Sequence, residues 1–443
     1  MHPLTRPPAH RLNPRLAATA GLVLGVATLA ALHIGRGIAY WDYSEGVYVF
    51  TSRLLLHGYD MYGQVVVAQP PGVILAGAGV LAIHDSLEWL RLVVGVGQLL
   101  AGLLAARVVW RLTRSPVATA LTPAAVLLTP WAVHAHGSLI PELLAAPLLL
   151  GAALLATERR TVAAAAVLVA IASFVKWPFV VPAAAIVLLS ANRTRALLWF
   201  AGTLAVEAAI ATAAYGGALW RDTVRAQLHS GSHTTHKLLG IWGQAGWSLA
   251  GLIVAAAVCL ALRRLIADRM LLRVMVGLSV GLLATILTVV KAGTGPDVLV
   301  PVEAVLVALA LSGLALAVRH APRPGGWLPA AAAGAGVLFT LAQTVSLFAS
   351  PGRTQPPFIY PTSQPGSWGR LNSDDEAHRI VAAIRRCPPG LPYLGAPYFA
   401  FLAHRSMPDN QPDQFLISHS PTLRAVAAKI TAVHPVCTGA PGS

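Results

Sequence analysis

The feature that most constrains this chain is a series of long apolar runs separated by short polar connections. A helix of roughly 18 or more apolar residues can cross the hydrocarbon core of a bilayer. A helix also satisfies its backbone N–H and C=O groups with internal hydrogen bonds, for which the lipid hydrocarbon offers no partner. We therefore expect about eleven membrane-spanning helices. Their approximate limits are 16–34, 90–110, 116–134, 139–156, 161–175, 177–191, 196–215, 246–262, 271–290, 298–318 and 327–349.

The composition agrees with a membrane protein. Of the 443 residues, 56% are hydrophobic and only 11% are charged. A soluble protein carries about a quarter charged residues, so this surface is better suited to lipid than to water. The expected fold class is an all-α polytopic membrane protein.

The positive charge reports topology rather than nucleic-acid binding. The formal net charge is +15, but the arginines cluster in every second connection between apolar runs. Arginine-rich connections stay on the cytoplasmic side, and a nucleic-acid site would need a continuous basic stripe. We expect a plasma-membrane protein with a cytoplasmic N-terminus and an extracytoplasmic C-terminus. The arginines concerned are Arg111, Arg114, Arg159, Arg160, Arg193, Arg195, Arg263, Arg264, Arg269, Arg319 and Arg323.

Two shorter segments decide the count of spans. The apolar segment 71–84 is too short to cross and would reverse the arginine pattern, so we interpret it as juxtamembrane or re-entrant. The segment 161–189 has arginines beyond both of its ends and Lys176-Trp177-Pro178 in its middle. This pattern favours a hairpin that turns at the outer surface over one long kinked helix.

The chain divides into a cytoplasmic N-terminus at 1–15, a transmembrane domain at 16–349 and a soluble exported domain at 350–443. Within the transmembrane domain, 35–89 and 216–245 are expected to be exported loops.

The exported domain is expected to be a small α/β unit. Ser373 is followed three residues later by Glu376, a capping box for a helix ending near Arg386, and 422–433 predicts another helix. Leu391–Leu394 is a candidate strand. Two cysteines of this domain, Cys387 and Cys437, would form a disulfide in an exported tail or remain free thiols, and the sequence leaves both open.

The first exported loop carries two carboxylates three residues apart, Asp42 and Glu45. Such a pair at a membrane surface can supply a general base or hold a divalent metal ion. The same spacing also fits a capping box, with Asp42 as the N-cap of a helix and Glu45 as its third residue. Spacing alone favours the capping box. Gly58 is expected to end this helix in a left-handed conformation.

The whole loop resembles the GT-C superfamily of polytopic glycosyltransferases, which use polyprenyl-phosphate sugars. The resemblance rests on the acidic motif after the first span, the interfacial helix, Gly58-Tyr59-Asp60-Met61-Tyr62 and the segment Gln69-Pro70-Pro71-Gly72. The groups in question are the protein O-mannosyltransferase-like, aminoarabinose-transferase-like and actinobacterial polyprenol-dependent enzymes. The resemblance implies that Asp42 is the essential acidic residue. Many members carry a second acid directly after the first, whereas here Tyr43 and Ser44 intervene before Glu45.

Three further candidates lie at ends of spans. Glu142 enters an apolar run, where a carboxylate usually faces a polar cavity, and the resembling families place an acidic residue in this area. Pairing with His136 at the interface is the alternative. Lys176 and Lys291 are candidates to absorb the charge of a departing lipid phosphate. Snorkelling to the membrane interface is the commoner fate of such lysines.

The second exported loop is basic. Arg221 and Arg225 are candidates to bind a phosphosugar or phosphate headgroups. His229, His233 and His236 have a spacing that would suit a metal ion on a helix, but Ser230-Gly231-Ser232 interrupts a helix there. Metal binding is therefore the weaker interpretation, and a divalent metal ion remains a candidate cofactor without an assigned site.

Together these features predict a membrane glycosyltransferase. The donor would be a polyprenyl-phosphate sugar, and the acceptor a hydroxyl of a cell-envelope glycan, lipid or protein. Membrane lipids are the other expected partners. Two alternatives stay open: a transporter or flippase, for which Glu207 and Glu303 would be the intramembrane carboxylates, and a catalytically silent scaffold that presents the exported tail.

Overall fold

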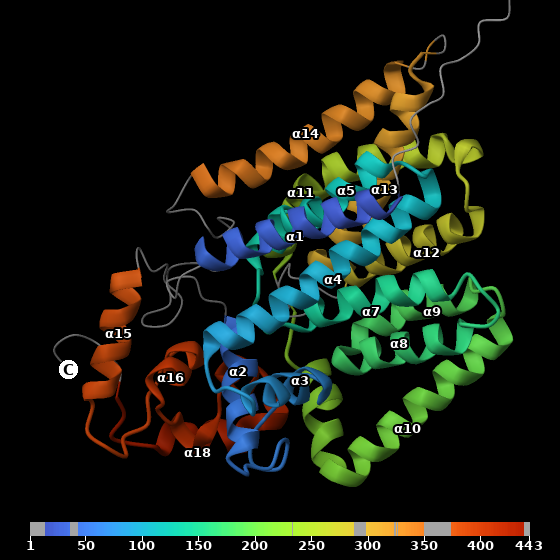
Figure 1. Ribbon diagram of the computed structural model, residues 1–443. Helices are drawn as coiled ribbons and strands as arrows, with labels where there is room; N and C mark the ends of the chain where they lie inside the picture. The colour runs from blue at the N-terminus through green and yellow to red at the C-terminus, as the bar shows by residue number, and fades with distance from the viewer. Residues whose placement is uncertain are drawn as a thin grey trace, which may run out of the picture.

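The computed structural model describes residues 14–35, 43–232, 234–287, 298–322, 325, 327–349 and 374–437. These residues form a bundle of roughly antiparallel helices with a cap of short helices at one end (Figure 1). The helices of the bundle and of its first loop are α1 (Pro14–Gly35), α2 (Tyr43–Leu56), α3 (Gly72–Leu81), α4 (Leu87–Thr113), α5 (Pro116–Leu127), α6 (Pro130–His134), α7 (Pro141–Leu155), α8 (Val162–Val175), η1 (Trp177–Phe179), α9 (Val180–Leu188), α10 (Arg193–Trp220), the π-helix η2 (Arg221–Ala226), α11 (Thr235–Ala261), η3 (Arg263–Leu265), α12 (Arg269–Thr285), α13 (Leu299–His320) and α14 (Trp327–Ala349). The helices of the tail are α15 (Asp374–Arg386), α16 (Pro397–Ala403), η6 (Pro408–Asn410), α17 (Gln414–His419), η7 (Pro421–Leu423) and α18 (Arg424–Ala432).

Each of the expected spans coincides with a helix, but the helices differ in length. In the described part of the chain, 6 helical segments are long and apolar enough to cross a membrane: Pro14–Gly35, Leu87–Thr113, Arg193–Ala226, Leu238–Ala261, Leu299–His320 and Trp327–Ser346. Helices α5, α7, α8 and α9 are apolar but shorter, and α12 has 17 residues. The structure therefore supports a multi-pass membrane protein without fixing the number of crossings at eleven.

The helix starts follow from local sequence. The Ser86 hydroxyl caps α4 by accepting a hydrogen bond from the Trp89 backbone N–H, and Asp268 caps α12 through the Leu271 N–H. Proline occupies the first turn of α5 and α7, where its missing N–H costs no helical hydrogen bond. Gly58 ends α2 with a φ of +84°, which confirms the expected left-handed stop.

Helix α13 is the centre of the bundle. Every residue from Leu299 to Gly313 is buried, and the helix packs against α4, α7, α11 and α14. Helix α10 lies at the periphery, where Leu198 and Ile210 are 70% and 66% exposed. Exposed aliphatic side chains on a long apolar helix are suited to contact with lipid.

The hairpin expected between residues 161 and 189 is confirmed. Helix α8 ends at Val175, the chain turns through Lys176 and η1, and α9 runs back beside α8. The Ala191 backbone N–H then donates to the Ala156 carbonyl at 2.8 Å, so both ends of the hairpin lie together. The expected juxtamembrane segment forms α3, whose 10 residues pack against α2.

The three regions expected outside the membrane meet at one end of the bundle. In Figure 1, α2, α3, α15, α16 and α18 gather at the lower left, and the connections from α9 to α10 and from α11 to α12 lie at the opposite, right-hand side. Arginines join the connections at that opposite side. Arg111 pairs with Asp268 at 2.6 Å, and Arg319 donates to the carbonyl groups of Thr113 and Arg114. The separation of the two ends is the one that the arginine pattern predicts.

The expected α/β character of the tail is not observed, because the described residues contain no β-strand. Tyr393, in the candidate strand 391–394, makes only an isolated bridge with Cys437. The expected helices are present as α15 and α18. A disulfide joins Cys387 to Cys437, with their Cα atoms 6.1 Å apart, which resolves the alternative left open by the sequence. This covalent link and the bridge take the place of a sheet in holding the end of the chain.

Candidate active site

Helix α2, which follows Asp42 in the chain, is fastened to the tail at its first residue. Asp42 itself lies outside the described residues, as does Lys291. The Tyr43 hydroxyl accepts a hydrogen bond from the Phe415 backbone N–H at 3.0 Å and lies 3.4 Å from a carboxylate oxygen of Asp413. The residue next to the proposed base is therefore held by residues more than three hundred and sixty positions away.

Glu45 lies in a buried ion pair. Its side chain is 0% exposed, and the Arg91 guanidinium donates to both carboxylate oxygens, at 2.9 and 2.7 Å. Arg91 comes from the first turns of α4 and also donates to the Tyr398 hydroxyl of α16 at 3.3 Å. A bidentate pair of this kind fixes orientation as well as charge. It joins α2, α4 and the tail at one point, and this geometry favours a positioning role for Glu45 over that of a free base.

Glu142 and Lys176 are brought together. Glu142 is in the first turn of α7, its side chain is 2% exposed, and it accepts a short hydrogen bond from the Lys176 ammonium at the turn of the hairpin. The lysine side chain retains 14% exposure. The alternative in which Glu142 pairs with His136 is thus replaced by a pair between two residues that the sequence assigned to different roles. Since neither side chain is extended into bulk water, the result is a mostly buried cation held in place by a carboxylate.

The first loop packs against this hairpin turn. A Cβ on Gly72 would lie 2.8 Å from the Phe174 carbonyl oxygen, so the Pro-Pro-Gly segment runs directly over the end of α8. Trp177 stacks on Trp220 with ring centroids 6.1 Å apart, which joins the turn to the end of α10. The hairpin turn is therefore in contact with both expected exported loops.

Arg221 is a second cation of this region and lies at the first residue of η2. Its guanidinium donates to the Tyr62 carbonyl at 2.7 Å and pairs with the buried Asp222 at 2.5 Å, while its side chain stays 39% exposed. Tyr62 is fully buried, burial raises the pKa of its hydroxyl, and that hydroxyl donates to the Gln69 carbonyl at 2.7 Å. Arg221 thus belongs to the framework of the first loop and still presents part of its charge to solvent.

The remaining candidates are less constrained. Arg225 is exposed on η2, with no side-chain partner recorded in the described part of the chain. His229 donates a hydrogen bond from Nδ1 to the Arg225 carbonyl at 2.7 Å, and His233 lies outside the described residues. Within the described ranges, no group of three His, Cys, Asp or Glu side chains could hold a metal ion.

The tail segment 404–415 has a structural role. The Gln411 side chain accepts from the Val66 N–H at 2.9 Å and donates to the Gln64 carbonyl at 2.7 Å. The Asp413 carboxylate caps α17 through the Leu416 N–H. These contacts hold the first loop against the tail.

Arg91 was not identified from the sequence. Its local signal is ambiguous, because an arginine at the start of an apolar run can snorkel to the interface or pair with a buried carboxylate. Its partner, Glu45, lies 46 positions away in the sequence. Their contact follows only from the packing of α2 on α4. Tyr398 carries no comparable signal in the sequence.

No protein-family model and no curated protein matches this sequence. Among solved structures, the chain is similar to ArnT from Cupriavidus metallidurans bound to undecaprenyl phosphate. The superposition has a TM-score of 0.59 at 14% identity and covers 90% of this chain and 87% of that one. Similarity at this level of identity concerns the fold alone, and it agrees with the polytopic helical architecture expected from the sequence. The chain is therefore a multi-pass membrane protein with a fold similar to that of ArnT.

Proposed function

We propose that this protein transfers a sugar from a polyprenyl-phosphate donor to an acceptor hydroxyl at the end of the bundle that carries the tail. The observation that carries the proposal is the fold shared with ArnT, a structure that contains undecaprenyl phosphate. The buried pairs at this end, Glu45 with Arg91 and Glu142 with Lys176, provide the ordered polar surroundings that such a reaction requires.

The proposed reaction is a direct displacement at the anomeric carbon. Asp42 accepts the proton of the acceptor hydroxyl, and the oxygen of that hydroxyl forms the new bond to the anomeric carbon. The bond from the anomeric carbon to the phosphate oxygen breaks, and the electron pair leaves with the polyprenyl phosphate. A positioned base typically contributes about 10²–10⁴-fold to such a rate.

The departing phosphate needs cations. Lys176 and Arg221 adjoin in sequence the stacked Trp177 and Trp220, and both retain exposed surface. Arg225 and Lys291 are further candidates for this role. Preorganised cations that contact charge developing in a transition state are commonly the largest electrostatic contribution to catalysis.

Glu45 and Glu142 are proposed to act as positioning residues. Arg91 occupies both oxygens of Glu45, so this carboxylate orients the first turn of the helix that follows Asp42. Glu142 holds the Lys176 ammonium at the hairpin turn. An ammonium fixed in this way needs little reorganisation when a phosphate approaches it.

The proposed orientation places this end outside the cytoplasm. The N-terminus and the arginine-rich connections would be cytoplasmic, and the tail at 350–443 would be an exported unit packed on the first loop. The Cys387–Cys437 disulfide supports export, because disulfides persist in oxidising compartments.

Of the two intramembrane carboxylates considered for a transporter, Glu303 makes structural hydrogen bonds. Glu303 is fully buried in α13, but its carboxylate accepts backbone hydrogen bonds from Trp131 at 3.0 Å and Ala132 at 3.3 Å. These contacts satisfy the first turn of α6, so the residue has a structural explanation. Glu207 keeps its interest for a transport function.

The test is sugar transfer from radiolabelled polyprenyl-phosphate mannose and arabinose in membranes that contain wild type, Asp42→Asn or Asp375→Asn. Asp375 is an exposed carboxylate of α15 and serves as the matched control. We expect transfer by wild type and by Asp375→Asn, with a loss of at least about a hundredfold for Asp42→Asn. A folded Asp42→Asn protein with full activity would refute the role of Asp42. Silence of wild type toward these and further polyprenyl-phosphate donors would refute the enzyme and favour transport.

A further inference from the structure

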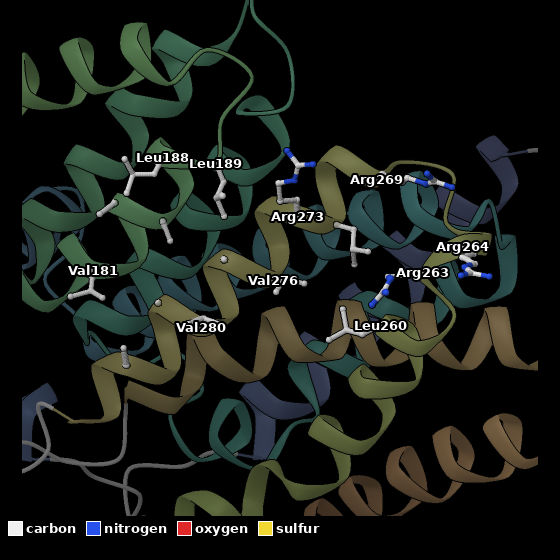
Figure 2. A pocket seen from close by; sticks show the side chains of 16 residues that line it. Val181, Leu188, Leu189, Leu260, Arg263, Arg264, Arg269, Arg273, Val276 and Val280 are labelled. Atoms are coloured by element: carbon white, nitrogen blue, oxygen red, sulfur yellow. The ribbon is translucent and has the colours of Figure 1, made fainter.

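A second feature lies at the end of the bundle that carries the arginine-rich connections. Helices α9, α11 and α12 enclose a groove with a volume of about 1040 Å³. Its walls are aliphatic, and Val181, Leu188 and Val280 are 44%, 61% and 62% exposed (Figure 2). Arg263, Arg264 and Arg269 line one end of it, and Arg273 lies between that end and Leu189 (Figure 2). The groove is therefore apolar along its length and strongly cationic at one end.

Small residues make the groove possible. A Cβ on Gly281 would lie 2.6 Å from the Pro182 Cα, and one on Gly277 would collide with the Leu189 side chain. Helices α9 and α12 consequently approach each other closely, and Ala184 and Ala185 leave space beside the contact. From Arg269 to Ala284, α12 rises roughly 22 Å at 1.5 Å per residue, which exceeds the roughly 15 Å of hydrocarbon in one leaflet. The groove can thus hold an extended hydrocarbon chain.

The arginines of the groove differ from the nearby Arg111 in their ion pairing. Arg111 is paired with Asp268 at 2.6 Å and lies 3.9 Å from Glu158. The four groove arginines are exposed, and none has a carboxylate within 4.0 Å among the described residues. In Figure 2, Arg263, Arg264 and Arg269 lie at the right-hand end of the view and Val181 and Leu188 at the left. Four clustered guanidinium groups without an acidic partner repel one another, and a polyvalent or well-placed anion relieves that repulsion.

We propose that this groove is a binding site for an anionic glycerophospholipid of the adjacent leaflet. The phosphodiester accepts hydrogen bonds from the arginines, for which a planar guanidinium is the best suited cation. One acyl chain lies along the aliphatic walls between α9 and α12. A basic pocket between membrane helices on the arginine-rich side is the setting in which anionic headgroups are recognised.

The site is separate from the proposed reaction centre. The arginines that would hold the phosphodiester lie on the side of Leu189, at the end of the hairpin, whereas Lys176 lies at its turn. The proposal therefore concerns a lipid that is bound and not consumed, and it holds whether or not the protein transfers sugar.

The test uses the purified full-length protein in a neutral detergent and native mass spectrometry. The probes are phosphatidylglycerol and phosphatidylcholine with identical acyl chains. We expect wild type to retain phosphatidylglycerol over phosphatidylcholine by on the order of tenfold. The variant R263Q/R264Q/R269Q/R273Q should lose that preference.

The matched control removes the same charge from the same end of the molecule. The variant R159Q/R160Q/R193Q/R195Q changes four exposed arginines outside the groove, and it should keep the preference. Equal loss in both variants would mean that bulk charge attracts the lipid and would overturn the site, as would no loss in either. Val280→Trp, which fills the groove and leaves every arginine in place, should also reduce retention. Circular dichroism confirms that each variant is folded.

Two competitors identify the ligand. Millimolar inorganic phosphate should not displace phosphatidylglycerol, because it has no acyl chain to fill the aliphatic part of the groove. Displacement would show that the acyl chain contributes little to binding and would refute its proposed role. Undecaprenyl phosphate should compete more weakly than phosphatidylglycerol. Stronger competition would refute the glycerophospholipid and assign the groove to the polyprenyl lipid.

Discussion

Replacing Arg91 with methionine is expected to destabilise the protein strongly. The change leaves the Glu45 carboxylate in a site where it is 0% exposed, without the guanidinium that pairs with both of its oxygens. Removing one partner of a buried ion pair typically costs about 3–5 kcal/mol, because the other charge remains desolvated. The two hydrogen bonds of 2.9 and 2.7 Å and the contact with the Tyr398 hydroxyl place Arg91 in that class.

The double variant separates charge from packing. Replacing Glu45 with leucine and Arg91 with methionine removes both charges and keeps apolar volume between α2 and α4. Such replacements are often neutral or stabilising, so the double variant should recover most of the loss. The control is Glu158→Gln, whose carboxylate is 64% exposed and 3.9 Å from Arg111, and which should change stability by less than about 1 kcal/mol.

The measurement is reversible unfolding of the detergent-solubilised protein, followed by tryptophan fluorescence and circular dichroism for all four proteins. A single Arg91→Met variant within about 1 kcal/mol of wild type would refute the buried-pair reasoning. A double variant no more stable than the single variant would show that the loss came from packing. Transfer activity measured in parallel should fall in the single variant, because the first turn of α2 then loses its anchor on α4.

Three further outcomes can be checked. Lys176→Met should lower the transfer rate per folded protein by about 10²–10³-fold, as measured with saturating donor, and an unchanged rate would exclude its proposed contact with the phosphate. Gly46→Leu should destabilise the junction of α2 and the tail by about 1–3 kcal/mol in an unfolding titration, because even a Cβ at Gly46 lies 2.5 Å from the Tyr398 backbone nitrogen. Replacing Cys387 and Cys437 with serine opens a loop with a sequence separation of 50 and should cost about 4 kcal/mol of tail stability, seen as faster limited proteolysis of the tail, and unchanged proteolysis would contradict this.

Most of the architecture could be predicted because its signals are local. Apolar runs report helices, and alternate arginine-rich connections report which helix ends lie together. Lys176-Trp177-Pro178 predicted the hairpin because a charged residue, an interfacial aromatic ring and a helix-breaking proline occur at one place. The segment 391–394 was misassigned for the opposite reason, since a short apolar stretch gains its conformation from its partner, here Cys437.

The sequence indicates which residues belong to the candidate site but not which of them contact one another. Glu142 and Lys176 were both identified, but their contact depends on how α7 packs against the end of α8. Arg91 was overlooked because a single arginine near the start of an apolar run has the same local signal whether it snorkels or pairs. Pairings across helices are set by the tertiary fold, and one sequence read alone does not contain them.

The fastening of the tail to the first loop has a consequence for how the protein is made. Tyr43 is synthesised 372 positions before Phe415 and Gln64 347 positions before Gln411, the two tail residues that hold them. A chain is synthesised at about 5–20 residues per second, so the first loop waits tens of seconds for its partners. A chain interrupted before Gln411 therefore lacks the contacts that hold Tyr43 and Gln64, and the first loop gains its final packing only when the tail has been made.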